Sequence, residues 1–393
     1  MTTPGPSRRA THPSPAPGPD SNPVQTGRRR PRAGGPAHAR SLRTHRVSTV
    51  VGLVLTGVLA FGGTAAAAFY LTLQGNVTEV DLAGLIDEDL RPPEPTPDPE
   101  DPSAGTAVNI LLIGSDDRSG DNAAIGGEDG GMRSDTTIVM HISADRSRVE
   151  LVSIPRDSLV DLPACETTQG TVEAREDAMF NNAFAEGWDT GGDIASAASC
   201  TVRAVESLTN VRLSGFVMVD FVGFQGMVDA IGGVPMTIPE EIVAPEAGLH
   251  LQPGEQVLDG TQALGLARAR KGTGPDMDGS DLNRIGRQQE LLGAMADKVL
   301  SQDILMDTPA LMSFLGAATS SLTASPEYSS LRNLAGLALS LRGIEPEDIT
   351  FLMTPVVDST KQRYRVEWTQ EAHDMWARMA ADEPVAGPAD VTR

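Results

Sequence analysis

Several common kinds of catalytic site have no counterpart in this sequence of 393 residues. With two cysteines and six histidines in all, it has no cluster of His and Cys ligands that would indicate zinc. The nucleophile elbow Gly-x-Ser-x-Gly of serine hydrolases does not occur. The glycine-rich stretch 119–132 contains no Gly-Lys-Ser or Gly-Lys-Thr, so it is not a phosphate-binding P-loop. The residues that carry chemistry must therefore be sought among carboxylates and arginines.

Positive charge is scarce once the N-terminal segment is set aside. Residues 1–46 hold nine of the 31 basic residues and one of the 53 acidic residues, Asp20, which leaves a net charge of −30 on the remainder. A domain so acidic is expected to repel nucleic acid and anionic membrane surfaces at long range. The arginine-rich segment itself has no helix-turn-helix pattern that would suggest DNA binding. A phosphorylated ligand would need a local basic pocket or a metal ion.

The first 73 residues predict a membrane anchor. Residues 1–46, rich in Pro, Ser and Gly, are expected to form a disordered cytoplasmic tail. Val47–Leu73 has no charged residue and is long enough to span a bilayer as a transmembrane helix. Arginines before it and acids after it predict a cytoplasmic N-terminus and an extracytoplasmic domain. A cleaved signal peptide is the alternative, which the length of the apolar run disfavours. Residues 74–106 are interpreted as a connector and a Pro-rich acidic spacer that holds the domain off the membrane.

Both cysteines, Cys165 and Cys200, lie in the part predicted to be outside the cell. Because paired thiols tend to oxidise there, we expect a disulfide between them. Two separate buried thiols are the alternative.

Alternating strand and helix patterns follow from Ala107 onward. Val108–Ile113 is a continuous apolar run, typical of a buried central strand. Residues 136–143 and 148–154 predict a hairpin, and pairing about its turn places Asp135 opposite Arg156. The other elements expected are strands at 216–220, 234–238, 349–353 and 363–368, and helices at 193–208, 221–231, 260–268, 285–300, 308–322, 331–341 and 370–380.

These elements predict an α/β domain with a mixed central β-sheet and helices on both faces. We expect a catalytic domain at 107–302 and a C-terminal α/β extension at 303–381 packed on it. Residues 382–393 are expected to be a disordered tail.

One stretch, residues 264–288, gathers basic residues inside the acidic domain. They are Arg268, Arg270, Lys271, Arg284 and Arg287. The helix at the end of this stretch places four residues on one inward face, Arg284, Gln288, Leu291 and Met295. Buried arginines need anions, and we infer that the anion is a substrate phosphate, gathered by this stretch and by Arg156. The ordinary alternative is pairing with the nearby carboxylates of Asp276, Asp278 and Asp281.

Two carboxylates are expected next to these arginines. Asp116 follows the buried strand, and Asp135 precedes the hairpin opposite Arg156. Two carboxylates with a few waters suit Mg²⁺, and planar guanidinium groups suit bidentate phosphate contacts. Together they would neutralise a pyrophosphate and stabilise a leaving phosphate. Alternatively, each acid caps a strand end or pairs with Arg156. Asp157 is interpreted as a structural residue that orients Arg156, and Asn181 as a helix cap.

At this point the motifs resemble those of the LytR-CpsA-Psr family. They are, in the family's order, NILLIGSDDR (109–118), RSDT (133–136), SIPRD (153–157), NNAFAEG (181–187), VDFVGFQGMVDAIGGV (219–234) and LDGTQALGLARARKG followed by DLNRIGRQQ (258–289). Six motifs in order are far more specific than any one of them. The insertion 119–132 between the two acids and the cysteine pair depart from the simplest family pattern.

The resemblance implies a single-pass cell-membrane enzyme with its catalytic domain outside the cell. It would transfer a glycopolymer from a polyprenyl-pyrophosphate carrier to a muramic acid hydroxyl of peptidoglycan, forming a phosphodiester. The implied catalytic residues are Asp116, Asp135 and Arg156, and the two acids would also hold Mg²⁺, with Mn²⁺ as the alternative. The residues implied to bind the pyrophosphate are Arg133, Arg156, Arg268, Arg270, Arg284, Arg287 and Gln288.

The polyprenyl tail would lie in an apolar tunnel of Leu, Val, Ile and Met side chains, since aromatic residues make up only 4% of the chain. Two other functions would use the same groups. A polyprenyl-pyrophosphate phosphatase would use water as the acceptor at the same site. A non-catalytic polyprenyl-phosphate-binding or regulatory module would need only the binding residues.

Overall fold

A computed structural model describes residues 38–95, 105–116, 122, 131–301 and 307–385. The chain forms two compact units, residues 1–64 and 65–393. Helix α1 (His38–Asn76) includes a segment, Arg46–Asn76, that is long and apolar enough to cross a membrane, with a mean hydropathy of 2.0. The expected N-terminal apolar helix is therefore present, although the helix already begins at His38, inside the segment predicted to be disordered.

The second unit is built on a seven-stranded mixed sheet, in the order β1-β14-β9-β2-β3-β4-β15. Its strands are β1 (Thr78–Glu79), β2 (Val108–Ser115), β3 (Ser134–Ile142), β4 (Val149–Ser153), β9 (Gly215–Val219), β14 (Leu322–Ala324) and β15 (Ile349–Met353). β2 is parallel to β9 and antiparallel to β3. The predicted mixed central sheet is confirmed.

Side chains of alternate residues along the strands enter different cores, because successive residues of a strand point to opposite faces. Leu111, Ile113 and Val139 pack with helices α3 (Asn182–Gly191), α4 (Ile194–Thr209) and α12 (Gln370–Ala380). Ile138 and Ile142 pack on the other face, with α7 (Asp281–Leu300) and α11 (Leu331–Ser340). Helices therefore cover both faces of the sheet, as predicted.

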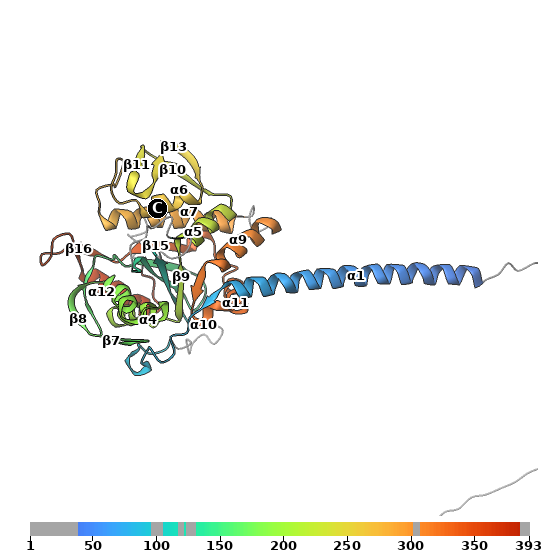
Figure 1. The fold of residues 1–393 in the computed structure, drawn as a ribbon, viewed down its shortest axis with the longest axis horizontal. Coiled ribbons are helices and arrows are strands. Elements are labelled where there is room, and N and C mark those ends of the chain that lie inside the picture. Colours follow the sequence, from blue (N-terminus) through green and yellow to red (C-terminus); the bar gives the residue numbers. More distant parts are fainter. Residues whose placement is uncertain (1–37, 96–104, 117–121, 123–130, 302–306, 386–393) are drawn as a thin grey trace, which may run out of the picture. The chain divides into compact units, whose positions relative to one another are not determined.

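A second core joins α7 to a lobe of short elements, coloured yellow in Figure 1. They are α5 (Phe221–Ala230), β10 (Val234–Ile238), β11 (Ile242–Ala244), η3 (Pro245–Ala247), β12 (Leu249–Leu251), β13 (Gly254–Leu258) and α6 (Gly260–Arg268). Asp220 caps α5, and Asp259 with Gln262 forms a capping box at the start of α6. Gly260 lets α6 approach α5 closely, since a Cβ there would lie 2.4 Å from the Gln225 carbonyl oxygen.

The remaining elements surround these two cores. They are η1 (Glu88–Leu90), β5 (Leu159–Leu162), β6 (Cys165–Thr167), β7 (Gly170–Val172), β8 (Arg175–Met179), α9 (Thr308–Ser320), α10 (Pro326–Ser329), η4 (Pro346–Asp348), β16 (Val356–Asp358) and β17 (Val366–Trp368). Cys165 of β6 and Cys200 of α4 form the predicted disulfide, with their Cα atoms 5.1 Å apart.

The predicted boundaries within the folded part are wrong in two places. The extension 303–381, expected to pack on the catalytic domain, instead contributes β14 and β15 to the central sheet itself. The connector is also partly folded: β1 pairs with β14, and the guanidinium of Arg91, at the start of the expected spacer, lies 2.7 Å from the buried carboxylate of Glu206. The rest of the spacer, 96–104, lies outside the described residues, as do most of the insertion 119–132 and residues 1–37.

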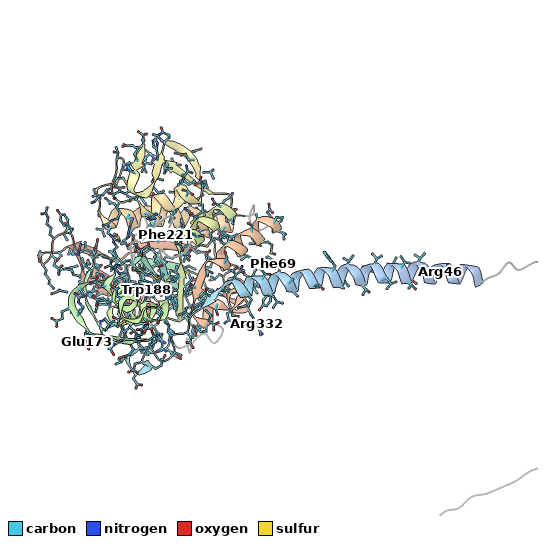
Figure 2. The ribbon with its side chains drawn as sticks, in the orientation of Figure 1. Arg46, Phe69, Glu173, Trp188, Phe221 and Arg332 are labelled. Atoms are coloured by element: carbon cyan, nitrogen blue, oxygen red, sulfur yellow. A yellow bond between two sulfur atoms is a disulfide. The ribbon has the colours of Figure 1, made fainter. Side chains whose placement is uncertain are left out.

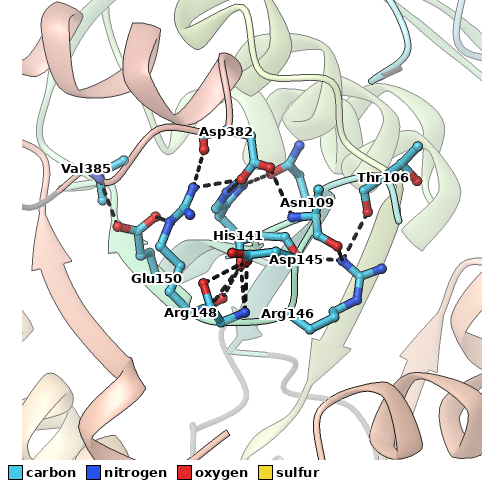
Figure 3. A network of polar contacts seen from close by, with 12 residues as sticks. Thr106, Asn109, His141, Asp145, Arg146, Arg148, Glu150, Asp382 and Val385 are labelled. Atoms are coloured by element: carbon cyan, nitrogen blue, oxygen red, sulfur yellow. Dashed lines mark hydrogen bonds and ion pairs between the residues drawn. The ribbon is translucent and has the colours of Figure 1, made fainter. Parts of the chain in front are cut away.

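The expected disorder from residue 382 is wrong as far as Val385. Figure 3 shows Asp382 beside His141 of β3, whose Nε2 lies 3.0 Å from Asp382 Oδ1. The Ala144 N–H donates to Asp382 Oδ2 over 3.0 Å, and Arg148 Nη2 donates to Asp382 Oδ1 over 2.7 Å. These contacts hold the chain after α12 against the β3–β4 hairpin, whereas residues 386–393 lie outside the described part.

Candidate functional site

The β3–β4 hairpin brings the first charged pair together. Its register pairs Ile138 with Ser153 and Val139 with Val152, which is the predicted pairing. Continued beyond the last paired residues, this register places Asp135 of β3 opposite Arg156, which follows β4. The two side chains form an ion pair through Arg156 Nη1 and Asp135 Oδ1. The sequence-based prediction of this contact is confirmed.

Helix α7 adds the second arginine from its first turns. Ser280 caps the helix by accepting the Leu282 N–H, so that Asp281 and Arg284 begin it side by side. The side chain of Arg284 is 2% exposed. Its Nη2 lies 2.6 Å from Asp281 Oδ1 and donates to the backbone oxygen of Asp135 over 2.6 Å, while Nη1 lies 3.7 Å from Asp135 Oδ2.

Asp281 links the two segments. It accepts the backbone N–H of Arg156 over 3.1 Å, and its Oδ1 lies 3.5 Å from Arg156 Nε. Sequence reasoning treated Asp281 only as a possible local partner of the arginines, and that pairing is indeed present. Its position one turn before Arg284 was the available signal, but its contact with Arg156, 125 residues away, had no local signal.

The ionisation of these groups follows from burial and from each other's charge. Burial acts to raise the pKa of Asp135, yet Arg156 and Arg284 outweigh it, so the pKa is lowered. Burial raises the pKa of Asp281 despite both arginines. Burial would lower the pKa of Arg156, but Asp135 and Asp281 raise it, whereas burial dominates at Arg284 and lowers its pKa. The charged forms of Asp135 and Arg156 are therefore favoured, whereas burial disfavours the charged forms of Asp281 and Arg284.

An apolar cavity of about 230 Å³ begins at this cluster. Its polar lining includes Ser115, Asp135, Asp220, Arg268, Arg284 and Gln288. Its apolar lining comes from β2, β3, β9, α5, α6 and α7, and includes Leu112, Ile138, Val217, Met227, Leu264, Leu291 and Met295. Arg268 lies over the ring of Phe221, labelled in Figure 2, with its Cζ 4.5 Å from the ring centroid. The cavity thus joins an apolar space to guanidinium and carboxylate groups.

Gln288 and Arg287 were both expected at the site, but only Gln288 lines the cavity. Gln288 donates to the Ala267 oxygen over 2.8 Å and accepts from Thr136 Oγ1 over 3.4 Å. Arg287 instead donates to the backbone oxygens of Asp276 and Ala269. Its guanidinium therefore secures the loop between α6 and α7, because buried carbonyl groups of an irregular segment need donors.

Three other predicted residues, Asp116, Arg133 and Arg270, do not line the cavity. Asp116, which is 7% exposed, accepts the backbone N–H of Arg133 over 2.6 Å, so it sits at the ends of β2 and β3. The Arg133 side chain is turned toward Asp189, 3.7 Å away, and no polar contact among the described residues joins it to Arg156 or Arg284. Arg270 Nη2 donates to the Gly279 oxygen over 3.3 Å.

The roles expected for Asp157 and Asn181 need correction. Asp157 makes its ion pairs with Arg270, at 3.9 Å, and Arg365, at 3.6 Å, rather than with Arg156. Asn181 precedes α3 in the cap position, but its side chain makes no capping hydrogen bond and its buried Oδ1 has no hydrogen-bond partner.

The described residues contain no group of three or more His, Cys, Asp or Glu side chains arranged to hold a metal ion. Any cation here would depend on Asp116 and Asp135 together with ligand oxygens. That donor set suits Mg²⁺, which commonly binds through one or two carboxylates, waters and substrate phosphates.

Comparison with known proteins places the chain in a family. A model of the LytR_cpsA_psr family matches residues 75–381. The chain is 28% identical over 277 residues to the cell wall biosynthesis protein LcpA of Corynebacterium glutamicum, covering 66% of this chain and 52% of that protein. It is 31% identical over 210 residues to the polyisoprenyl-teichoic acid–peptidoglycan teichoic acid transferase TagU of Oceanobacillus iheyensis, covering 53% of this chain and 57% of that protein. The matches thus span little more than half the length of these relatives.

A solved structure shows the same fold. The LytR-Csp2A-Psr enzyme from Actinomyces oris aligns with a TM-score of 0.53 at 19% identity, over 78% of this chain and 96% of that one. The family match takes in the connector, β14 and β15, which the structure also places in the folded unit. This chain belongs to the LytR-CpsA-Psr family.

Proposed function

We propose that this protein is an extracytoplasmic phosphotransferase that moves a glycopolymer from a polyprenyl-pyrophosphate carrier onto a muramic acid hydroxyl of peptidoglycan. One observation carries the proposal: an apolar cavity begins at a cluster of arginines and carboxylates, with the half-buried Arg268 and the buried Arg284 in its wall. A polyprenyl pyrophosphate has the matching chemistry, since an apolar chain is joined to a diphosphate. The TagU relatives, named as polyisoprenyl-teichoic acid–peptidoglycan transferases, support this substrate class.

In the proposed reaction, the acceptor hydroxyl attacks the phosphorus nearer the glycan. A new P–O bond forms to the muramic acid oxygen, and the bond from that phosphorus to the bridging oxygen breaks, so that polyprenyl phosphate leaves. Arg156 and Arg284 stabilise the charge that develops on the leaving phosphate. The hydroxyl proton passes to a carboxylate.

Asp135 fits an electrostatic role better than that of a strong base. Its lowered pKa keeps the carboxylate ionised and able to accept a proton. The same shift makes it weakly basic, and general-base catalysis is most efficient when the pKa lies near the working pH. We therefore assign Asp135 mainly to holding Arg156 and the phosphate-side charge.

Asp116 and Asp135 are the proposed ligands of Mg²⁺, or of Mn²⁺, at the ends of β2 and β3. When bound, such an ion would neutralise charge on the pyrophosphate oxygens. We also propose that the apolar helix spans the membrane with its N-terminus in the cytoplasm, since its arginine-rich flank precedes it. The partners proposed for the protein are then the membrane, the lipid-linked glycan and peptidoglycan. Nucleic acid is not among them.

The test uses the full chain in detergent micelles with a labelled polyprenyl-pyrophosphate-linked glycan, with and without uncrosslinked peptidoglycan strands. We expect labelled glycan to appear on peptidoglycan and polyprenyl phosphate to be released only when the acceptor is present. Arg156→Ala should abolish transfer, whereas Arg332→Ala, at an exposed position of α11, should leave it unchanged.

The other outcomes distinguish the alternatives. Equal release of lipid phosphate without acceptor would identify a phosphatase. Lipid binding without turnover, unaffected by Mg²⁺, would identify a binding module. Either result would overturn the transferase proposal.

A further inference from the structure

The β16–β17 hairpin lies against the strand end that carries Arg156. The Val366 N–H donates to the Asp157 oxygen over 3.3 Å, and Val366 also forms a parallel bridge with Ser158. The segment that connects β16 to β17, residues 359–365, is therefore fixed beside the charged cluster. It lies in the C-terminal part of the chain, to which sequence reasoning assigned no role.

Asp157 sets two arginines side by side at this place. Its Oδ2 lies 3.9 Å from Arg270 Nη2 and its Oδ1 lies 3.6 Å from Arg365 Nη1. Both distances exceed hydrogen-bond length, so the carboxylate attracts the two guanidinium groups without consuming their N–H donors. The buried Nε of Arg270 has no hydrogen-bond partner. Arg270 Nη2 also donates to the Gly279 oxygen, and Arg365 Nη1 donates to the Tyr364 oxygen over 2.8 Å. Each guanidinium carries further N–H groups, so two partly exposed arginines share one counter-charge and retain donors for a ligand.

This pair lies outside the lining of the apolar cavity. Arg268, Arg284 and Gln288 line the cavity, whereas Asp157, Arg270 and Arg365 do not. A diphosphate held between Arg156 and Arg284 would therefore have its apolar tail on one side. Its sugar side would face Arg270 and Arg365.

The rim of the segment is aromatic and basic. The Tyr364 side chain is 75% exposed on a backbone with φ of 62°, a conformation that bulky residues rarely adopt. Arg363 Cζ lies 4.4 Å from the Tyr364 ring centroid, and Arg363 makes no ion pair with the described residues. Lys361 is already paired with Asp177 at 2.5 Å, so the available positive charge comes from the arginines. An exposed ring beside guanidinium groups suits a sugar that carries carboxylates.

We propose that Arg365 and Tyr364, organised by Asp157 beside Arg270, form the subsite for the acceptor, a peptidoglycan strand with carboxylate-bearing peptides. The inference rests on the proposed transferase function. The acceptor is the better occupant than the donor glycan, because the cavity and the arginine cluster already anchor the donor at its lipid and diphosphate.

Two measurements on the full chain in detergent micelles test the subsite. The first is binding of soluble, uncrosslinked peptidoglycan strands without any donor, compared with neutral chitin oligosaccharides. The second is the KM for each substrate in the transfer assay. Arg365→Gln and Tyr364→Ala should each weaken strand binding and raise the acceptor KM roughly three- to tenfold, as expected for loss of one partly exposed charged or stacking contact. The donor KM should stay unchanged.

Matched variants control for charge and folding. Arg332→Gln removes an exposed positive charge from α11 and should leave both KM values unchanged. Arg365→Lys retains the charge and should recover most of the acceptor binding. An unchanged acceptor KM in Arg365→Gln, or a rise in the donor KM instead, would overturn the subsite. If the wild-type chain binds strands through Arg365 but transfers nothing, the transferase proposal fails and the binding site stands.

Discussion

Replacing Arg284 tests whether the buried cluster is both a structural ion pair and a phosphate-binding group. Arg284→Met leaves Asp281, whose side chain is 5% exposed, without its 2.6 Å partner. Breaking a buried pair by removing one partner costs about 3–5 kcal/mol. The loss should appear as a lower midpoint of thermal unfolding, by roughly 2–4 °C for each kcal/mol in a domain of this size range.

A double variant separates stability from function. In Arg284→Met combined with Asp281→Leu, both buried charges are gone, and such replacements are often neutral or stabilising. Recovery should be incomplete, because the Arg156 N–H loses the acceptor that Asp281 provides, at a cost of about 1–3 kcal/mol. Transfer activity should be absent in both variants, since the proposed phosphate ligand is missing.

Stability should also respond to pH in a definite direction. Burial raises the pKa of Asp281 in the folded chain, so the folded state binds the proton more tightly than the unfolded state. The contribution of Asp281 to the free energy of unfolding should fall as the pH rises from the ordinary aspartate pKa through the raised pKa of the folded chain. This fall should be steeper in Arg284→Met. A single variant as stable as the wild type would refute the buried pair. A double variant that still transfers glycan would refute the phosphate contact.

Four further perturbations have definite expected outcomes. Ala267→Trp, at the cavity wall, should abolish lipid binding in a pull-down with labelled polyprenyl phosphate while leaving circular dichroism unchanged. Gly260→Val should force α6 from α5 and lower the thermal midpoint, with loss of transfer. Asp382→Asn should reduce stability at neutral pH. Burial acts to raise the pKa of Asp382, but the hydrogen bond with His141 helps to lower it overall. The stabilising contribution of Asp382 therefore exists above the ordinary aspartate pKa and disappears as the pH falls through the lowered pKa. The variant's denaturant midpoint should therefore depend less on acid pH. Cys200→Ser should cost about 2–5 kcal/mol of unfolding free energy, and reduction of the wild type should match it.

The hairpin shows what the sequence could predict about the site. A strand has a period of two and a short turn fixes the pairing, so the residues around Asp145 were enough to place Asp135 opposite Arg156. The inward direction of Arg284 followed in the same way from the helical period and its apolar neighbours at Leu291 and Met295. Both are local rules applied to strong patterns.

The errors concern contacts between segments far apart in the chain. Residues 349–353 were predicted as a strand, whereas residue 322 was placed in a helix, and neither prediction included the central sheet. Strand pairing over such separations has no local signature in the sequence. The partners of Asp157 were missed for the same reason, since Arg365 lies more than two hundred residues away.

The two interpretations of the arginine cluster, internal pairing and phosphate binding, describe the same arrangement. Arginines that await a ligand must be held in position without it, and unpaired buried charge is too costly to persist. Asp281 meets that need permanently, because its side chain is 5% exposed and touches both Arg156 and Arg284. Asp135 pairs with the same arginines, but its side chain is 38% exposed. It is therefore the counter-charge that the proposed pyrophosphate would replace, and its release would free a carboxylate for the proposed cation.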